Sequence, residues 1–299
     1  MDRFVIEGGK RLEGEIEVYG AKNAILPMMA GSILAKGKTI IHNVPDISDV
    51  SIFLGILEHL GADCIYDKET KKLELDTTNI NKTDVPYELV CQIRASFLVS
   101  APLLARLGRA KISFPGGCSL GTRNIDFHIK GFKMFSADVN GEGGYIILRA
   151  DRLRGADIYL DYPTHTGTEN IMMAGVLAEG KTIIENCAME PEIVDFAKFL
   201  RKMGAKIGGE GTGTITIDGV DSLKPCEYWP IPDRIETGTF IMAGAIANGG
   251  VFVKNAIYEH LKGPIAKLRD MGISIEKKDS GILVVGQDRL TSTNVITGP

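Results

Sequence analysis

The feature that most constrains the fold of this chain is an internal repeat. GAKNAILPMMAGSILAKGKTIIHNVPDISDVSIFLGILEHLGADC is matched by GTENIMMAGVLAEGKTIIENCAMEPEIVDFAKFLRKMGAKI and by ETGTFIMAGAIANGGVFVKNAIYEHLKGPIAKLRDMGISI. A weaker copy, RASFLVSAPLLARLGRAKISFPGGCSLGTRNIDFHIKGFKMFSADV, lies between the first two. A glycine recurs after the first helix of each copy, at Gly37, Gly108, Gly180 and Gly249, so the period is about 70 residues. Four aligned copies predict a fold built from repeated units.

The first copy shows the element order that each unit is expected to have. An apolar helix over 24–34 ends at a glycine, and a β-branched strand follows at 38–41. A second helix over 50–60 has apolar residues at helical spacing, and short strands at 63–66 and 72–75 close the unit. With a further strand before the first helix, this order predicts α/β units of the form βαβαββ.

The first helix of each unit is apolar on nearly every side, as in Ala-Ile-Leu-Pro-Met-Met-Ala at 24–30. The corresponding apolar helices are expected over 89–104, interrupted by Arg94, and over 171–177. Such a helix should be buried all round, which places helices inside and sheets outside. Three units about a pseudo-threefold axis would form one closed domain over 22–230. The fourth unit, 231–299, would then be left with an incomplete core.

The composition excludes several function classes. The net charge is −4, aromatic residues make up 7%, and no long run of Lys or Arg occurs, so nucleic acid is not expected as a partner. No apolar stretch approaches the ~18 residues of a membrane span, and the first residues lack the apolar core of a signal peptide. We therefore expect a soluble protein without a membrane partner.

The cysteines and histidines do not form a ligand pattern. The five cysteines are odd in number and widely spaced, with no C-x-x-C pair, and the five histidines show no ligand spacing. We expect neither disulfides nor a metal site, and a reducing cytoplasm as the setting. Four cysteines read as small hydrophobic residues: Cys64, Cys91, Cys187 and Cys226. The fifth, Cys118, stands in a glycine-rich loop, Gly-Gly-Cys-Ser-Leu-Gly at 116–121, with Arg123 nearby to lower its thiol pKa.

Five segments carry a resemblance to a known family. They are Gly-Ala-Lys-Asn-Ala at 20–24, Arg-Ala-Ser at 94–96, Pro-Gly-Gly-Cys-Ser-Leu-Gly-Thr-Arg at 115–123, Glu-Pro-Glu-Ile-Val-Asp at 190–195 and Pro-Asp-Arg-Ile-Glu-Thr-Gly at 232–238. On these segments the whole chain resembles the UDP-N-acetylglucosamine 1-carboxyvinyltransferases, enolpyruvyl transferases of peptidoglycan synthesis. The resemblance implies an inside-out α/β barrel fold in two domains of three units each. It also implies that residues 1–21 join 231–299 in a partial second domain, as the strand-like 4–6 and 15–19 suggest. It also implies two further units, on the order of 140 residues, after Pro299, and a catalytic aspartate beyond that point.

The implied reaction moves the enolpyruvyl group of phosphoenolpyruvate to the 3′-hydroxyl of UDP-N-acetylglucosamine and releases phosphate by addition and elimination. It needs a general acid, a base and cations for a phosphate and a carboxylate, and no metal or organic cofactor. By resemblance Cys118 donates the proton, Lys22 grips phosphoenolpyruvate, and Asn23 and Arg123 complete that site. Lys22 also lies at a predicted helix N-terminus, where anions are favoured. The resemblance implies no obligate protein partner, and a role in cell shape and division.

The nucleotide side of the site is likewise implied by resemblance. Asn23, Arg94 and Arg123 would hold the sugar nucleotide, and Asn124, Ile125, Asp126 and Phe127 would shape the uridine pocket. Thr164, His165 and Thr166 stand where the family commonly has Ser-Val-Gly around the diphosphate, so His165 adds a titratable group. Asp233 and Arg234 are interpreted as an interdomain pair. Two alternatives remain open: a UDP-sugar-binding module without turnover, and a relative that acts on another acceptor.

Overall fold

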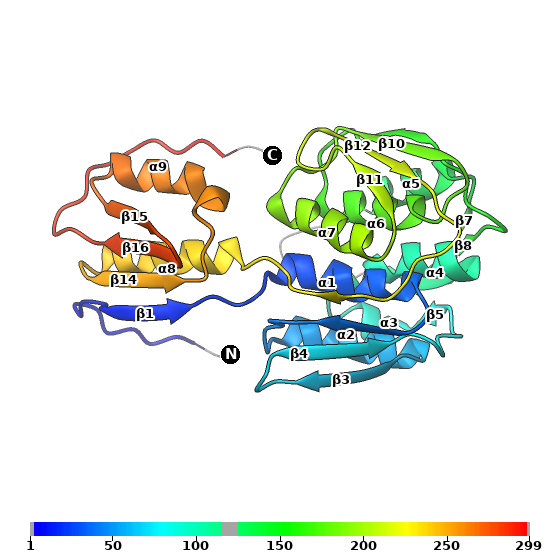
Figure 1. Cartoon of the computed structure of the whole chain (residues 1–299), viewed down its shortest axis with the longest axis horizontal. Helices are drawn as coiled ribbons and strands as arrows, with labels where there is room; N and C mark the ends of the chain where they lie inside the picture. The colour runs from blue at the N-terminus through cyan, green and yellow to red at the C-terminus, as the bar shows by residue number, and fades with distance from the viewer. Residues whose placement is uncertain (1–2, 115–124, 298–299) are drawn as a thin grey trace. The chain divides into compact units, whose positions relative to one another are not determined.

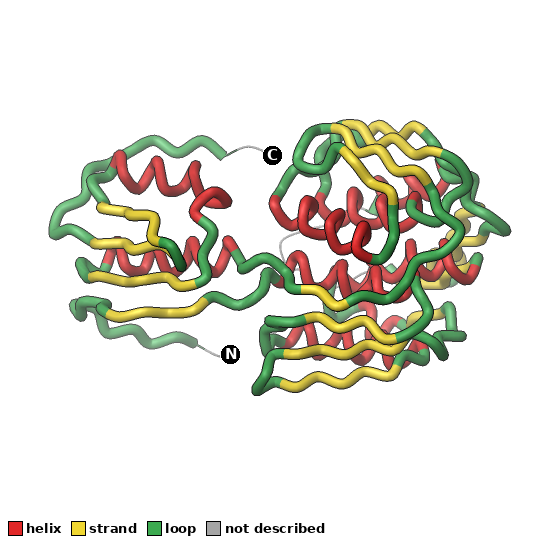
Figure 2. The backbone as a smooth tube through the Cα atoms, viewed as in Figure 1, coloured by secondary structure: helices red, strands yellow, loops and turns green. Residues whose placement is uncertain are grey.

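The computed structural model of the protein describes residues 3–114 and 125–297 (Figures 1 and 2). The chain divides into two compact units, one of residues 22–231 and one of residues 1–21 with 232–299. We call them the large unit and the small unit, and each is described by itself. No helix in the described ranges is long and apolar enough to cross a membrane.

Three internal segments form the centre of the large unit. They are α1 (Lys22–Gly31) with a 3₁₀ turn at Ser32–Leu34, the 3₁₀ segment Arg94–Val99 with α4 (Ser100–Leu107), and α6 (His165–Gly175). Every residue from 24 to 35 is buried, which confirms that an all-round apolar helix lies inside. Outer helices accompany them: α2 (Ser48–Leu60), α3 (Tyr87–Val90), α5 (Asp126–Met134) and α7 (Pro191–Lys202).

Three four-stranded sheets of one design surround these helices in the part of the large unit that is described. Their strand orders are β13-β2-β4-β3, β5-β6-β8-β7 and β9-β10-β12-β11, each with one parallel and two antiparallel pairs. In Figure 1 the helices lie between the sheet of β10 to β12 and the sheet of β3 and β4, so sheets are outside. The strands are β2 (Lys38–Ile41), β3 (Asp63–Asp67), β4 (Lys72–Asp76), β5 (Asp84–Val85), β6 (Arg109–Ser113), β7 (Asp138–Glu142), β8 (Tyr145–Arg149), β9 (Asp157–Tyr159), β10 (Lys181–Glu185), β11 (Lys206–Gly208), β12 (Thr214–Asp218) and β13 (Glu227–Tyr228).

The small unit contains one more sheet, of order β1-β14-β16-β15, in which β1 pairs in parallel with β14. It repeats the same design with one strand taken from the start of the chain. Its helix α8 buries only one side, and Ile235, Met242 and Ile246 are at least half exposed. The elements are β1 (Gly14–Glu17), α8 (Arg234–Ile246), β14 (Gly250–Lys254), a 3₁₀ turn (Tyr258–Leu261), α9 (Lys262–Asp270), β15 (Ser274–Lys278) and β16 (Gly281–Val285).

Two sequence-based expectations about local structure are wrong. Residues 4–6 do not form a strand, and Phe4 is 97% exposed, because among the described residues no neighbouring strand pairs with them. The apolar run 89–104 is not one helix either, since Ile93 is extended between α3 and the 3₁₀ segment. The hydroxyl of Ser96 donates to the carbonyls of Val90 and Ile93 at 3.0 and 2.6 Å. Such local bonds compete with the regular helical ladder.

Candidate functional site

The three internal segments of the large unit end at one pole. A cavity of about 550 Å³ is lined there by Leu34, Ala35, Ala105, Arg106 and Leu177, among other residues. Arg106 of α4 ties two of these ends together, because its guanidinium donates to the carbonyls of Ile33 and Ala35, and it also donates to the Thr77 carbonyl, all at 2.8–3.1 Å. The segments therefore begin at the opposite pole, where Lys22, Arg94 and His165 are their first residues.

Side-chain bonds also join two of these segments. The Asn170 amide donates to the Phe97 carbonyl and to the Ser100 hydroxyl, both at 3.2 Å, so α6 packs directly against the segment from Arg94. Several residues predicted for the site thus share one end of the large unit although they are far apart in sequence.

Lys22 begins α1, and its ammonium lies 3.6 Å from the carboxylate of Asp49 on α2. The lysine side chain is 43% exposed, and Asn23 beside it is exposed as well. A positive side chain next to the free N–H groups of a helix start suits an anionic ligand. Lys22 is therefore still accessible to a ligand at the start of α1 although it contacts Asp49.

Residues 125–127 lie at the start of α5. Ile125 is buried, Asp126 is exposed and Phe127 is half-buried. The adjacent His128 is buried, and its Nδ1 and Nε2 lie 2.8 Å from the Asn170 amide and 3.4 Å from the Thr166 hydroxyl. Burial and the charge of Arg94 lower the pKa of His128 to about 3, so this ring is neutral. His128 therefore holds the start of α5 against the start of α6.

The helix that the sequence predicts at 171–177 begins six residues earlier, at His165. Thr164 is its N-cap, and its hydroxyl accepts from the Gly167 N–H at 3.3 Å. Position 167 must be glycine for this, because a Cβ there would lie 2.4 Å from the Thr164 Cγ2. The Thr168 hydroxyl donates to the Thr164 carbonyl at 2.7 Å and accepts from Ala188 N–H at 3.1 Å. The three residues predicted to hold a diphosphate are thus a cap and the first turn of a buried helix.

A buried ion pair lies directly beneath this turn. His165 Nδ1 is 3.1 Å from Glu169 Oε1, and Glu169 is 1% exposed. Burial lowers the pKa of His165, but Glu169, Glu190 and Glu192 together raise it to about 9. Burial also raises the pKa of Glu169, against the opposing effect of His165. Sequence reasoning missed Glu169, although its i, i+4 spacing from His165 was visible.

Five further residues are predicted for the site. Cys118, Arg123 and Asn124 lie outside the described residues, so their assignment stays a prediction. Asp233 belongs to the small unit, where its carboxylate caps α8 by accepting from Ile235 and Glu236 N–H groups at 2.7 and 3.0 Å. Arg234 is the first residue of α8. An interdomain role for the pair also stays a prediction.

The other four cysteines are free thiols, of which Cys187 is buried and Cys64, Cys91 and Cys226 are partly exposed. Burial raises the pKa of Cys64 to about 12 and the pKa values of Cys187 and Cys226 to about 11. These three thiols are poor nucleophiles at neutral pH. No cluster of histidine, cysteine and acidic side chains suited to a metal ion occurs in residues 3–114 and 125–297.

Comparison with known proteins defines the class to which this fold and site belong. The profile of the EPSP synthase (3-phosphoshikimate 1-carboxyvinyltransferase) family matches residues 6–297. Two solved structures share the fold: the enolpyruvyl transferase NikO from Streptomyces tendae, with a TM-score of 0.84 over 95% of this chain and 68% of that one, and EPSP synthase from Acinetobacter baumannii, with 0.73 over 93% and 66%. Their sequence identities are 24% and 20%. The inside-out barrel expected from the resemblance is thereby confirmed.

The curated relatives that match this chain carry a more specific name than the family. UDP-N-acetylglucosamine 1-carboxyvinyltransferase of Desulfatibacillum aliphaticivorans is 48% identical over 299 residues, 100% of this chain and 71% of that protein. The corresponding enzyme 1 of Staphylococcus epidermidis is 49% identical over 301 residues, 100% of this chain and 72% of that protein. The chain belongs to the EPSP synthase family and, within it, to the UDP-N-acetylglucosamine 1-carboxyvinyltransferases. It spans slightly more than seven tenths of the length of these relatives.

Proposed function

We propose that the protein transfers the enolpyruvyl group of phosphoenolpyruvate to the 3′-hydroxyl of UDP-N-acetylglucosamine and releases phosphate, a committing step of peptidoglycan synthesis. The observation that carries the proposal is the 46–49% identity, along essentially the whole chain, to relatives named for this activity. The same names favour transfer over a UDP-sugar-binding module without turnover. They also favour UDP-N-acetylglucosamine over a different acceptor.

The residues proposed for phosphoenolpyruvate are Lys22, Asn23, Cys118 and Arg123. Lys22 offers a positive charge at the start of α1, where backbone N–H groups also favour an anion. Cys118 would protonate the methylene carbon of phosphoenolpyruvate, and Arg123 would lower the thiol pKa and neutralise developing negative charge. The hydroxyl of the acceptor sugar then gives up its proton to a base and adds to the adjacent carbon, which forms a tetrahedral intermediate. Loss of phosphate together with one proton of the new methyl group restores the carbon–carbon double bond and completes the transfer.

The residues proposed for the sugar nucleotide lie at the starts of the two other internal segments of the large unit and of the outer helix α5. Arg94 begins one segment, Thr164, His165 and Thr166 begin α6, and the stretch 124–127 leads into α5. Support comes from the hydrogen bonds that hold α5, α6 and the Arg94 segment together at this pole. Asp233 and Arg234 are proposed as an interdomain pair, and residues 22–230 as the catalytic domain.

We also propose a cytoplasmic location and a role in cell shape and division, since both follow from peptidoglycan synthesis. The free state of the four described cysteines suits a reducing compartment. Phosphoenolpyruvate and the UDP-sugar are the only partners that the proposal requires.

The proposal is tested by phosphate release from phosphoenolpyruvate with and without UDP-N-acetylglucosamine. We expect sugar-dependent release in the 299-residue chain and its loss in Cys118→Ala. The matched control, Cys64→Ala, removes a thiol whose pKa is raised by burial and should retain release. Absence of release together with absence of UDP binding would contradict the proposed function. Equal release in Cys118→Ala would contradict the assignment of the proton donor.

A further inference from the structure

The position of His165 presents an electrostatic problem. It is the first residue of α6, and the N-terminus of a helix carries partial positive charge that disfavours a cation. Yet the Glu169 carboxylate is buried one turn below at 3.1 Å from His165 Nδ1, an arrangement that stabilises the charged ring. A pair that served only the stability of α6 would be better placed at the other end of the helix.

Among the described residues, the second ring nitrogen of His165 has no hydrogen-bond partner. Its Nε2 is buried and forms no hydrogen bond with any residue in the described ranges. A buried N–H without an acceptor destabilises the folded state, and more so when the group is charged. The structure thus places an unsatisfied charged donor at the N-terminus of a helix, two features that suit one anionic group.

The groups packed around His165 are consistent with a single localised cation. Glu169 faces it from α6, and Glu190 and Glu192 face it from the start of α7. From α5, His128 reaches the neighbouring Thr166 but is neutral, and Lys130 on the same helix is paired with Asp161 at 2.8 Å. Arg94, from the 3₁₀ segment, acts on His128.

We propose that Glu169 holds His165 as an imidazolium whose Nε2–H binds the diphosphate of the nucleotide substrate. This inference rests on the proposed function, because it takes the sugar nucleotide as the ligand. His165 is then a binding residue that makes nucleotide affinity depend on pH, and Glu169 is the residue that positions and charges it. The carboxylates raise the pKa of His165 to about 9, so the ring is charged at neutral pH and loses its proton in mildly alkaline solution.

The experiment is an NMR titration of the histidine ring protons in the chain, with UDP as the probe. The chain has five histidines, and the resonance missing from His165→Gln identifies His165. We expect a titration midpoint near 9 in the free chain. Because binding and protonation are reciprocally linked, saturating UDP should raise that midpoint by about half a pH unit or more. Uridine, which has no phosphates, should leave it unchanged.

Binding measurements supply an independent readout. At pH 7.5 we expect His165→Gln to weaken the Kd for UDP about tenfold, the usual size for one charge-assisted hydrogen bond. The difference from the unaltered chain should vanish above pH 10, and comparison of the two proteins cancels the ionisation of uracil itself. Glu169→Gln should lower the His165 midpoint and weaken UDP binding at pH 7.5. His59→Gln, a histidine on α2, is the matched control and should have no effect.

The outcomes separate the two proposals. UDP binding with an unmoved His165 midpoint, or with equal affinity in His165→Gln at pH 7.5, overturns this inference and leaves the proposed function standing. Failure to bind UDP, together with the absence of sugar-dependent phosphate release, overturns both. A midpoint near the ordinary histidine value also overturns the inference, because the imidazolium would then not be held at neutral pH.

Discussion

At the scale of single residues, the buried pair of His165 and Glu169 links pH to stability. The pKa of His165 is raised in the folded chain to about 9 from an ordinary value near 6.5. A raised pKa means that protonation favours the folded state, so the stabilisation is complete below pH 6.5 and is lost as pH rises towards 9.

We therefore expect the free energy of unfolding to fall between pH 6.5 and 9 by more in the unaltered chain than in His165→Gln. Urea unfolding at several pH values in this window measures the difference. Groups that titrate in both proteins cancel in the comparison. Parallel pH profiles for the two proteins would show that the pKa of His165 is not raised by folding.

Gly167 is a second position at which adding a single atom, a Cβ, would change the local structure. In Gly167→Ala the new Cβ would meet the Thr164 Cγ2 at 2.4 Å, so the cap must move. Loss of an N-cap costs about 1–2 kcal/mol of unfolding free energy. Thr164→Ser removes the methyl group and keeps the hydroxyl, so the double variant should recover part of the loss. Urea unfolding of the four proteins tests this, and additive effects would contradict it.

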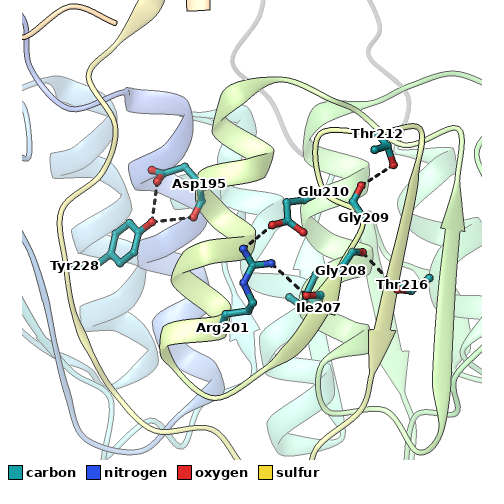
Figure 3. A network of polar contacts seen from close by, with 9 residues as sticks. All are labelled: Asp195, Arg201, Ile207, Gly208, Gly209, Glu210, Thr212, Thr216 and Tyr228. Carbon is teal, nitrogen blue, oxygen red and sulfur yellow. Dashed lines mark hydrogen bonds and ion pairs between the residues drawn. The ribbon is translucent and has the colours of Figure 1, made fainter. Parts of the chain in front are cut away.

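At the scale of elements, β13, the last strand of the large unit, joins the sheet formed by its first strands, β2 to β4. It has two residues and pairs in parallel with β2, so Glu227 and Tyr228 face Ile40 and Ile41. The buried carboxylate of Asp195 on α7 holds this segment (Figure 3). It accepts from the Tyr228 hydroxyl at 2.8 Å and from the Ile231 N–H at 3.0 Å.

We expect Asp195→Ala to destabilise the large unit by about 1–3 kcal/mol, because both donors lose their acceptor. Tyr228→Phe should cost less, and the two changes together should cost less than their sum. Amide exchange should accelerate at Ile40 and His42, whose N–H groups donate to Cys226 and Tyr228 carbonyls at 2.9 Å.

Glu210→Gln is the control for this element. Glu210 forms an ion pair with Arg201, which lies on α7 as Asp195 does (Figure 3). The Arg201 guanidinium also donates to the Ile207 carbonyl. Glu210→Gln should leave exchange at Ile40 and His42 unchanged. Unaltered exchange in Asp195→Ala would show that β13 is held by its strand pairing alone.

At the scale of the whole molecule, the two units differ in how much apolar surface they bury. In the large unit three sheets enclose fully buried helices, whereas α8 of the small unit leaves Ile235, Met242 and Ile246 exposed. Because burial of apolar surface dominates folding stability, the small unit should unfold first.

The order in which the two units unfold can be tested with the single tryptophan. Trp229 lies in the large unit, stacked on His42 with ring centroids 4.0 Å apart. Its fluorescence should report only the later transition in urea, while far-UV circular dichroism should show both. In Trp229→Phe with Tyr258→Trp, a reporter in the small unit, fluorescence should follow the earlier transition. Coincident curves for all probes would mean that the units unfold together.

Local patterns predicted the elements whose residues satisfy themselves within one repeat. The helix over 24–34 and the strand over 38–41 follow from continuous apolar and β-branched runs, and both are present. The start of α6 escaped prediction because Thr168, Glu169 and Asn170 are polar yet buried. Their burial is possible only with partners such as His128 and Ala188, which are far away in sequence.

The sequence by itself determined the repeated unit, the internal position of its first helix and membership of the family, because these depend on periodicity and local motifs. Tertiary structure alone decided that β13 would complete the first sheet and that the Glu169 carboxylate would be buried. A two-residue strand and a buried charge have no stable local form. Strand β13 exists only because β2 and Asp195, many positions away, provide its hydrogen bonds, and Glu169 is buried only because distant segments exclude water from it.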